Sequence, residues 1–169
     1  AYQMAFRDEL TGLPGRRALN ERMQRLGRNY VLAMSDVDHF KRFNDTHGHD
    51  VGDQVLRLVA SKLSKVNGGG RAYRYGGEEF AIVMPDTDID AAYKVLDEIR
   101  QRFAEIHYPA QPQDLWCTFS AGVVQMSEES DSLMMASQAD EALYRAKHAG
   151  RNRVHSARQA KHRATFSSE

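Results

Sequence analysis

Four residues whose types suit a cation and a phosphorylated ligand follow one another in the chain: Gly76, Gly77, Glu78 and Glu79. Strand-forming residues precede them over 71–75, and the apolar run 80–84 follows and ends at a Pro-Asp turn signal. A Gly-Gly pair between strands predicts a hairpin with a type I′ turn, in which both glycines have positive φ. Adjacent carboxylates repel each other and glycines leave the backbone open, so a cation and a bulky phosphate would both fit there. The alternative is a solvated acidic turn without a ligand.

A second acidic element follows a predicted buried strand. The apolar run 30–35 ends at Asp36-Val37-Asp38, and α/β folds place ligands at the C-terminal ends of strands. Mg²⁺ takes one or two carboxylates together with substrate phosphates. Asp36, the Val37 carbonyl and the Glu78/Glu79 pair would converge on one or two Mg²⁺ ions if the strand and the hairpin are neighbours. Alternatively, Asp36 or Asp38 caps the following helix, and for Asp38 alone we favour this interpretation.

Basic and amide side chains come directly after this element. Lys41 and Arg42 place two cations within a helical turn of the predicted metal site, where they would stabilise a polyphosphate. Asn44 and Asp53 have the groups needed to distinguish guanine, because a carboxylate accepts from its ring N–H and exocyclic amine while an amide pairs with another edge atom. The His-Gly-His run that includes His49 is a weak transition-metal signal without cysteine, and we interpret His49 as a structural or phosphate-contacting residue.

Taken together, these residues resemble the GGDEF family of diguanylate cyclases. The resemblance extends over five separated motifs in the family's order, from about position 8 to 154. The motifs are residues 8–17 (DELTGLPGRR), similar to the family's DxLTGLxNR opening; Asp36 with the segment 44–53; residues 76–80; residues 119–123; and residues 139–147 followed by 150–154. One position departs from the opening motif, because Gly15 stands where the family usually has Asn. This change concerns a local cap or turn and not the chemistry.

The resemblance implies a role for each matching residue. It implies metal ligation by Asp36, the Val37 carbonyl, Glu78 and Glu79, for two Mg²⁺ ions per active site with Mn²⁺ as a substitute. Glu78 also occupies the position of a general base for the 3′-hydroxyl, and both roles stay open. The implied substrate contacts are Lys41 as a transition-state-stabilising cation, Asn44 and Asp53 as guanine readers, His49, Gly76 and Gly77 as further contacts, and Lys147 with Arg151 as late phosphate contacts.

The implied reaction condenses two GTP molecules into cyclic di-GMP and releases two pyrophosphates. One GTP per domain requires a second copy of the domain in a transient homodimer, and in this family an upstream regulatory domain usually controls the pairing. The alternative function is a catalytically silent GGDEF-like module that binds GTP or cyclic di-GMP as a regulatory domain. Degenerate members usually lose residues of the Gly-Gly-acidic-Glu-Phe run, and none is lost here. A mononucleotide cyclase making cyclic GMP fits the motif set less well.

The composition agrees with one compact domain. The chain has 169 residues, 41% of them hydrophobic, and this length can bury ~70% of its unfolded surface. Lys plus Arg and Asp plus Glu both number 23, so the zero net charge argues against a nucleic-acid partner. The single cysteine, Cys117, excludes an internal disulfide and fits a core position in a reducing, cytoplasmic compartment. No apolar stretch approaches the ~20 residues of a membrane span, so we expect a soluble domain without direct membrane contact, whether or not its parent is anchored.

Helical and strand patterns alternate along the chain. Helices are predicted over 13–26, 87–106 and 132–149, and a further helix is predicted to begin at an Asp50 N-cap and to end at the glycine run 68–70. Strands are predicted over 30–36, 71–75, 80–84 and 115–124. Helices that flank a mixed, mostly antiparallel sheet make an α/β fold of the α+β kind, and the resemblance implies a ferredoxin-like core similar to nucleotide cyclases and polymerase palms. We assign 8–157 to the GGDEF domain, 1–7 to the end of a connecting helix and 158–169 to a mobile tail.

Many members of the family also have an inhibitory product site, whose signature Arg-x-x-Asp ends five residues before the Gly-Gly run. Its two positions are Asn67 and Gly70 in this chain. Neither offers the phosphate fork of arginine or an acceptor for guanine, and three consecutive glycines are costly to order. The alternative is a rearranged site that uses Arg71 and Arg74, which lie nearby but out of register. We predict that cyclic di-GMP does not inhibit noncompetitively through this loop, as progress curves with added product and calorimetry can test. Tight product binding that disappears when residues 67–70 are changed would contradict the prediction.

Overall fold

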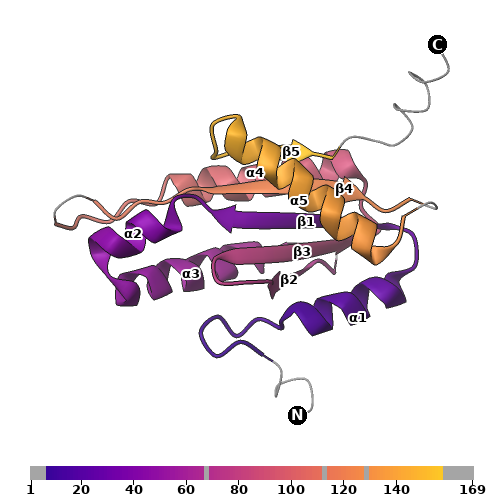
Figure 1. The fold of residues 1–169 in the computed structure, drawn as a ribbon, viewed down its shortest axis with the longest axis horizontal. Coiled ribbons are helices and arrows are strands. Elements are labelled where there is room, and N and C mark those ends of the chain that lie inside the picture. Colours follow the sequence, from indigo (N-terminus) through magenta and orange to yellow (C-terminus); the bar gives the residue numbers. More distant parts are fainter. Residues whose placement is uncertain (1–6, 67–68, 112–113, 128–129, 158–169) are drawn as a thin grey trace.

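The computed structural model describes residues 7–66, 69–111, 114–127 and 130–157, which form one five-stranded sheet with helices on both faces (Figure 1). The strands are β1 (Tyr30–Val37), β2 (Arg71–Arg74), β3 (Glu79–Pro85), β4 (Phe119–Gln125) and β5 (Val154–Ser156). The helices are α1 (Arg16–Leu26), α2 (Phe40–His47), α3 (His49–Leu63), α4 (Ile89–Ala104) and α5 (Ser132–His148).

The central strand of the sheet is β1. The strand order is β2-β3-β1-β4-β5, in which β1 pairs antiparallel with β3 and β4, and β5 pairs parallel with β4. All 8 residues of β1 are buried, because the strand has a partner on each side and helices above and below it. The predicted mixed, mostly antiparallel sheet is confirmed.

Side chains of β1 alternate between two hydrophobic cores. Val31 and Ala33 pack with α3 and α4 on one face of the sheet, whereas Leu32 and Met34 pack with α1 and α5 on the other. Since strand side chains repeat every second residue, Asp36 falls on the α1/α5 face. The hydrophobic pattern of β1 therefore also determines which helices surround the first predicted metal ligand.

Cys117 lies in the core formed with α3 and α4, as predicted. Burial raises the pKa of its thiol to about 12, and the nearby Asp38 charge acts in the same direction. The thiol therefore stays protonated and unreactive at neutral pH. Among the described residues, no helix is long and apolar enough to cross a membrane.

Several predicted helix limits differ from the structure, by two or three residues at the start of α1 and at both ends of α4, and at both ends of α3. α3 begins at His49, because Gly48 with φ of 91° ends α2 and turns the chain directly into the next helix, so Asp50 lies in the first turn and is not the N-cap. The same helix ends at Leu63, before the glycine run that was expected to end it. Gly15 is the N-cap of α1 and gives it no side-chain cap, which is the local effect expected of its departure from the motif.

The hairpin between β2 and β3 forms, but not with the predicted type I′ turn. Neither Gly76 nor Gly77 has a positive φ. Instead, the N–H groups of Tyr75 and Gly76 both donate to the carbonyl oxygen of Glu79, at 2.9 and 3.2 Å. The result is a wider loop, whose shape is fixed by contacts described below.

The C-terminal half also shows differences. β4 begins at Phe119, later than predicted, and the short strand β5 was not predicted. α5 ends at His148, and Gly150 with φ of 126° follows its C-cap, as expected. The predicted connecting helix over residues 1–7, apart from Arg7, the predicted tail over 158–169 and part of the glycine run (67–68) lie outside the described residues.

α5 lies against β4 and β1 (Figure 1). A glycine in β4 allows this close approach: a Cβ atom at Gly122 would lie 2.3 Å from the Leu143 nitrogen and 2.4 Å from the Ala139 carbonyl oxygen. Both are backbone atoms of α5, so they cannot move without moving the helix. Gly122 thus sets how near the C-terminal turn of α5 comes to the end of β1.

We predict that Gly122→Ala lowers the free energy of unfolding by about 1–3 kcal/mol, because the added methyl group overpacks the β4–α5 contact. Urea unfolding followed by circular dichroism would measure the change. Gly77→Ala is the matched control, since a Cβ atom there meets nothing within 4 Å and the φ is not positive. Equal stability of the two variants would show that Gly122 does not limit the approach of α5.

Candidate active site

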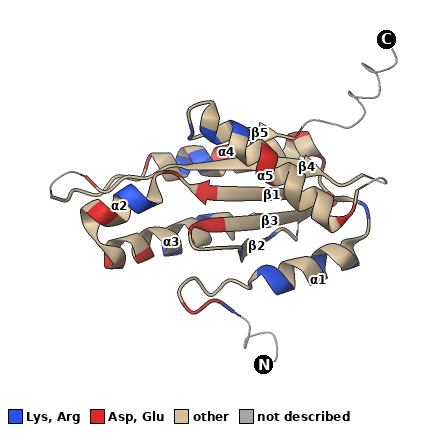
Figure 2. Ribbon diagram, in the orientation of Figure 1, with Lys and Arg blue, Asp and Glu red and all other residues tan. Residues whose placement is uncertain are grey.

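Two predicted metal ligands face each other on neighbouring strands. Asp36 near the end of β1 is paired in register with Glu79 at the start of β3, and Figure 2 shows the acidic ends of these strands side by side. The Val37 N–H donates to the Glu78 carbonyl oxygen at 3.2 Å, which joins the two chain segments at this end. Because directly paired strand residues have Cβ atoms about 5 Å apart, the two carboxylates share one small region.

A lysine from α5 partly neutralises the first carboxylate. Lys147 Nζ forms an ion pair with Asp36 Oδ2. Burial raises the pKa of Asp36, which is 8% exposed, while the hydrogen bond and charge of Lys147 and the charge of Arg151 act in the opposite direction. The structure therefore brings both predicted late phosphate contacts near a predicted metal ligand.

The second carboxylate, Glu79, lies in an excess of negative charge. Burial is the largest cause that raises its pKa, and the charges of Asp36, Asp140 and Glu78 raise it further, against the opposing charge of Lys147. Asp140 was not predicted as a site residue, although it precedes Lys147 by two helical turns and thus shares its face of α5. A bound cation would relieve the repulsion among these carboxylates.

Arg74 holds the tip of the hairpin. Its guanidinium donates to the carbonyl oxygens of Gly76 at 3.2 Å and Gly77 at 2.8 Å, and also to both carboxylate oxygens of Asp8 at 2.9 Å. Burial tends to raise the pKa of Asp8, but hydrogen bonds from Thr11 and Arg74 hold it below its usual value. The opening motif therefore supports the hairpin tip, a role that the sequence analysis missed.

Four predicted nucleotide contacts, among them the two base readers Asn44 and Asp53, lie on the two helices after β1. Lys41 and Asn44 belong to α2, and His49 and Asp53 belong to α3. In the described part of the chain, no hydrogen bond or ion pair joins these four side chains to the acidic cluster. The Asn44 Oδ1 atom is buried without a hydrogen-bond partner, a condition that costs about 1–3 kcal/mol and that a bound ligand could relieve.

The interpretation of Asp38 as a helix cap is wrong. The N-cap of α2 is His39, which has a φ of 54° and makes no side-chain cap bond. Asp38 is 6% exposed and accepts hydrogen bonds from the hydroxyls of Thr118 at 2.6 Å and Ser120 at 2.7 Å. Partners 80 and 82 residues away in sequence outcompete the local cap.

The donor set suits a hard divalent cation. Asp36 and Glu79 offer carboxylates from adjacent strands, and Mg²⁺ binds one or two protein carboxylates together with phosphates and water. Among the described residues, no three His, Cys, Asp or Glu side chains are arranged as a metal-ligand group. The Val37 carbonyl, water and substrate would supply the other ligands, and Mn²⁺ accepts the same oxygen donors.

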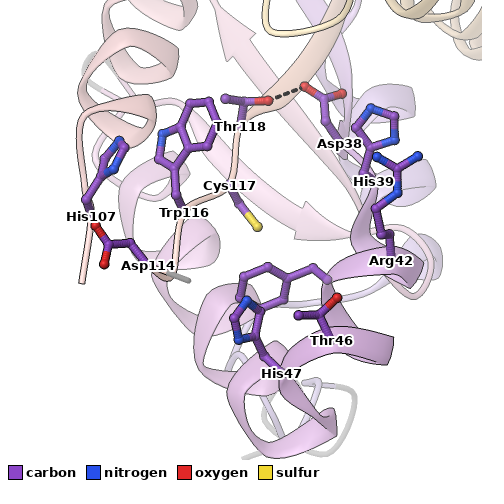
Figure 3. A pocket seen from close by; sticks show the side chains of 11 residues that line it. Asp38, His39, Arg42, Thr46, His47, His107, Asp114, Trp116, Cys117 and Thr118 are labelled. Carbon is purple, nitrogen blue, oxygen red and sulfur yellow. Dashed lines mark hydrogen bonds between the residues drawn. The ribbon is translucent and has the colours of Figure 1, made fainter. Parts of the chain in front are cut away.

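A cavity of about 440 Å³ lies away from these residues, between α2 and the segment before β4 (Figure 3). Its lining includes His39, Arg42, His107 and Trp116; of the residues predicted to contact a phosphate it contains only Arg42, and it contains none of the predicted metal ligands or base readers. Asp38 closes one side of it and connects to Thr118 by the hydrogen bond drawn in Figure 3. The predicted metal ligands thus lie at the strand ends and not in this cavity.

Comparison with known proteins identifies the family. Residues 5–153 match the diguanylate cyclase, GGDEF domain family. The chain is 40% identical over 162 residues to the diguanylate cyclase DgcP of Pseudomonas aeruginosa and 37% identical over 165 residues to the response regulator PleD of Caulobacter vibrioides. The alignment with DgcP includes 90% of this chain and 24% of DgcP, and the alignment with PleD includes 91% of this chain and 36% of PleD. The chain therefore spans about a quarter to a third of the length of each relative.

Solved structures agree in fold. The GGDEF domain of DgcB from Caulobacter crescentus, in complex with c-di-GMP, superposes with a TM-score of 0.85 at 37% identity, over 92% of this chain and 94% of that one. The GGEEF domain of a diguanylate cyclase from Vibrio cholerae gives a TM-score of 0.76 at 36% identity, over 88% and 99%. The chain belongs to the GGDEF family of diguanylate cyclase domains.

Gly52 offers a test of how Asn44 is held. A Cβ atom at Gly52 would lie 1.8 Å from Asn44 Oδ1, so the amide occupies the space that only glycine leaves free in α3. Gly→Ala inside a helix normally stabilises by about 0.5–1 kcal/mol. We predict that Gly52→Ala does not give this gain in denaturant unfolding, because the new methyl group must take the space of the Asn44 side chain.

The same substitution in an Asn44→Ala background is the control. Removal of the amide opens the space, although Phe40 still lies 3.3 Å from the new methyl group. In that background Gly52→Ala should be neutral or stabilising. An equal change in stability in both backgrounds would mean that Asn44 is not what Gly52 accommodates.

Proposed function

We propose that this domain is a diguanylate cyclase that condenses two GTP molecules into cyclic di-GMP. In each half-reaction, a 3′-oxygen of one GTP attacks the α-phosphorus of the other in line, the proton of that hydroxyl passes to a base, and pyrophosphate leaves. The observation that supports this most directly is the cross-strand placement of Asp36 against Glu79, with Lys147 paired to Asp36. This arrangement combines anionic oxygens for a metal with a cation for a phosphate.

Two Mg²⁺ ions, or Mn²⁺ in their place, would be held by Asp36, the Val37 carbonyl, Glu78 and Glu79. When bound, they lower the pKa of the attacking hydroxyl and neutralise the leaving pyrophosphate. Glu78 lies in the hairpin loop just before β3, whereas Glu79 is the first residue of that strand, so we assign the Glu78 side chain as the group that would accept the 3′-hydroxyl proton. We assign Glu79 mainly to metal binding and keep both roles for Glu78.

The remaining residues would bind the nucleotide. Lys41, Lys147 and Arg151 supply positive charge for the phosphates from α2, α5 and the turn after α5. Asn44 and Asp53 would pair with guanine, and the buried, unpartnered Asn44 Oδ1 supports a ligand near this position. Gly76 and Gly77 would let the phosphates approach the hairpin backbone, and His49 would add a contact from the first turn of α3.

The domain would act as a transient homodimer, since one site holds one GTP and the reaction consumes two. Positioning of two bound substrates supplies much of the rate, up to ~7–11 kcal/mol for well-oriented groups. The relatives are longer than this chain, so we propose that an upstream regulatory domain controls pairing of a cytoplasmic catalytic domain over residues 8–157. No role for nucleic acid or direct membrane contact is proposed.

Glu79→Gln tests the proposal, because it should separate catalysis from stability. We expect turnover of GTP with Mg²⁺ to fall at least about 100-fold, since a charge that stabilises the transition state is removed. The metal-free domain should keep or gain stability: burial raises the pKa of Glu79, so the folded state prefers the neutral group and loses nothing when Gln replaces the carboxylate. Product mass spectrometry and thermal unfolding would measure the two effects.

Glu98→Gln on the exposed face of α4 is the matched control and should change neither quantity. Stabilisation by added Mg²⁺ and GTP should be weaker in Glu79→Gln than in the control. Cyclic GMP as the product would identify a mononucleotide cyclase, and GTP binding without product would identify a catalytically silent module. Either result for the unsubstituted domain contradicts the proposed activity, and full turnover of Glu79→Gln contradicts the role of Glu79.

A further inference from the structure

The turn after α5, which carries Arg151, has an unfavourable backbone. Gly150, Arg151 and Asn152 have φ of 126°, 63° and 49°, so two consecutive residues with side chains adopt the left-handed region. A residue with a side chain is unfavourable in this region and persists there only where surrounding contacts impose it. The contacts that impose this turn therefore also determine where Arg151 lies.

One of these contacts is the buried carboxylate of Asp38. Its Oδ2 accepts from the Asn152 N–H at 2.9 Å, and its two oxygens also accept from the hydroxyls of Thr118 and Ser120. The Ser120 hydroxyl itself accepts from the same Asn152 N–H at 3.1 Å. Asp38 therefore fastens the Arg151 turn to β4 from inside the protein.

A second contact comes from α4. Arg100 Nη1 donates to the Asn152 side-chain oxygen at 2.7 Å and to the Asn152 carbonyl oxygen at 3.1 Å. Arg100 is held in turn by Asp97, whose Oδ1 accepts from Arg100 Nε at 2.7 Å and whose Oδ2 accepts from Gln101 at 3.0 Å. The Arg100 side chain is only 14% exposed. The N–H, the carbonyl oxygen and the side-chain oxygen of Asn152 are therefore engaged by Asp38, Ser120 or Arg100.

We propose that Asp38 and Arg100 are positioning residues, which hold Asn152 between them and so place Arg151 beside Asp36 to bind the phosphates of GTP. The inference rests on the phosphate-binding role proposed for Arg151. Asp38 follows Asp36 by two residues, so the end of β1 fixes both a metal ligand and the phosphate-binding turn. Arg100 belongs to α4, which covers the face of the sheet opposite α5, and it acts on Arg151 through Asn152.

A double-mutant cycle separates this role from a merely structural one. Arg100→Met removes the donors but keeps the aliphatic length of the side chain, Arg151→Ala removes the phosphate contact, and the third variant combines both. The probe is 3′-deoxy-GTP with Mg²⁺, which lacks the attacking hydroxyl and is not consumed, and isothermal titration calorimetry gives its Kd. Arg102→Met on the exposed part of α4 is the control.

We expect Arg151→Ala to weaken binding about tenfold and Arg100→Met about threefold to tenfold, a range typical of coupled neighbours. The double variant should bind no more than about twofold more weakly than Arg151→Ala, because Arg100 acts only through Arg151. Arg100→Lys, which keeps one donor, should recover part of the affinity. Arg102→Met should bind like the unsubstituted domain.

Additive losses in the double variant would overturn the proposal, as would unchanged affinity in Arg100→Met or in Arg151→Ala. Lower thermal stability of Arg100→Met with normal affinity would assign Arg100 a structural role only. If Arg100→Met does not fold, Arg100→Lys serves in the same cycle. Failure of the unsubstituted domain to form cyclic di-GMP would refute the proposed function while leaving the coupling in 3′-deoxy-GTP binding measurable; absence of that binding would refute both.

Discussion

The buried negative charge at the end of β1 is the constraint on which the rest of the structure depends. A carboxylate that loses its water needs opposite charge or hydrogen-bond donors, or it becomes protonated. Asp36 meets this need with Lys147, and Asp38 meets it with two hydroxyls and a backbone N–H. These partners come from α5, from β4 and the residue before it, and from the turn after α5. The elements around the central strand are therefore arranged to satisfy two charges at its end.

The ion pair between Asp36 and Lys147 contributes little to stability by itself. Desolvation of two charges offsets most of their attraction, and pairs of this kind are often no better than an apolar contact of the same size. Its consequence is geometric, because it requires the last turn of α5 to lie over β1. Gly122 makes that approach possible, since any side chain there would meet the α5 backbone. Close packing and charge pairing therefore depend on each other.

Much of the fold and part of the site could be predicted from local sequence. The apolar run before Asp36 predicted a buried strand, helical spacing predicted α4 and α5, and the motif set predicted the family. What could not be predicted depends on distant partners. Asp38 has the sequence of a helix cap, yet its partners are 80 to 114 residues away. The loop shape at Gly76 is set by Arg74 and Asp8, and no local pattern specifies that contact.

Two arginines illustrate why the supporting residues escape a reading of the sequence. Arg74 binds hairpin carbonyls and Asp8, and Arg100 binds Asn152 and Asp97, so each guanidinium joins one acidic side chain to backbone oxygens of a loop. Only arginine has donors in a planar fork that can reach both partners at once. In each case the arginine belongs to a strand or helix, and the backbone oxygens that it binds belong to a loop. The rigid sheet and α4 thereby impose defined geometry on the two loops that would contact the nucleotide. In the turn after α5, this geometry is maintained at a cost in backbone strain that the rest of the domain must offset.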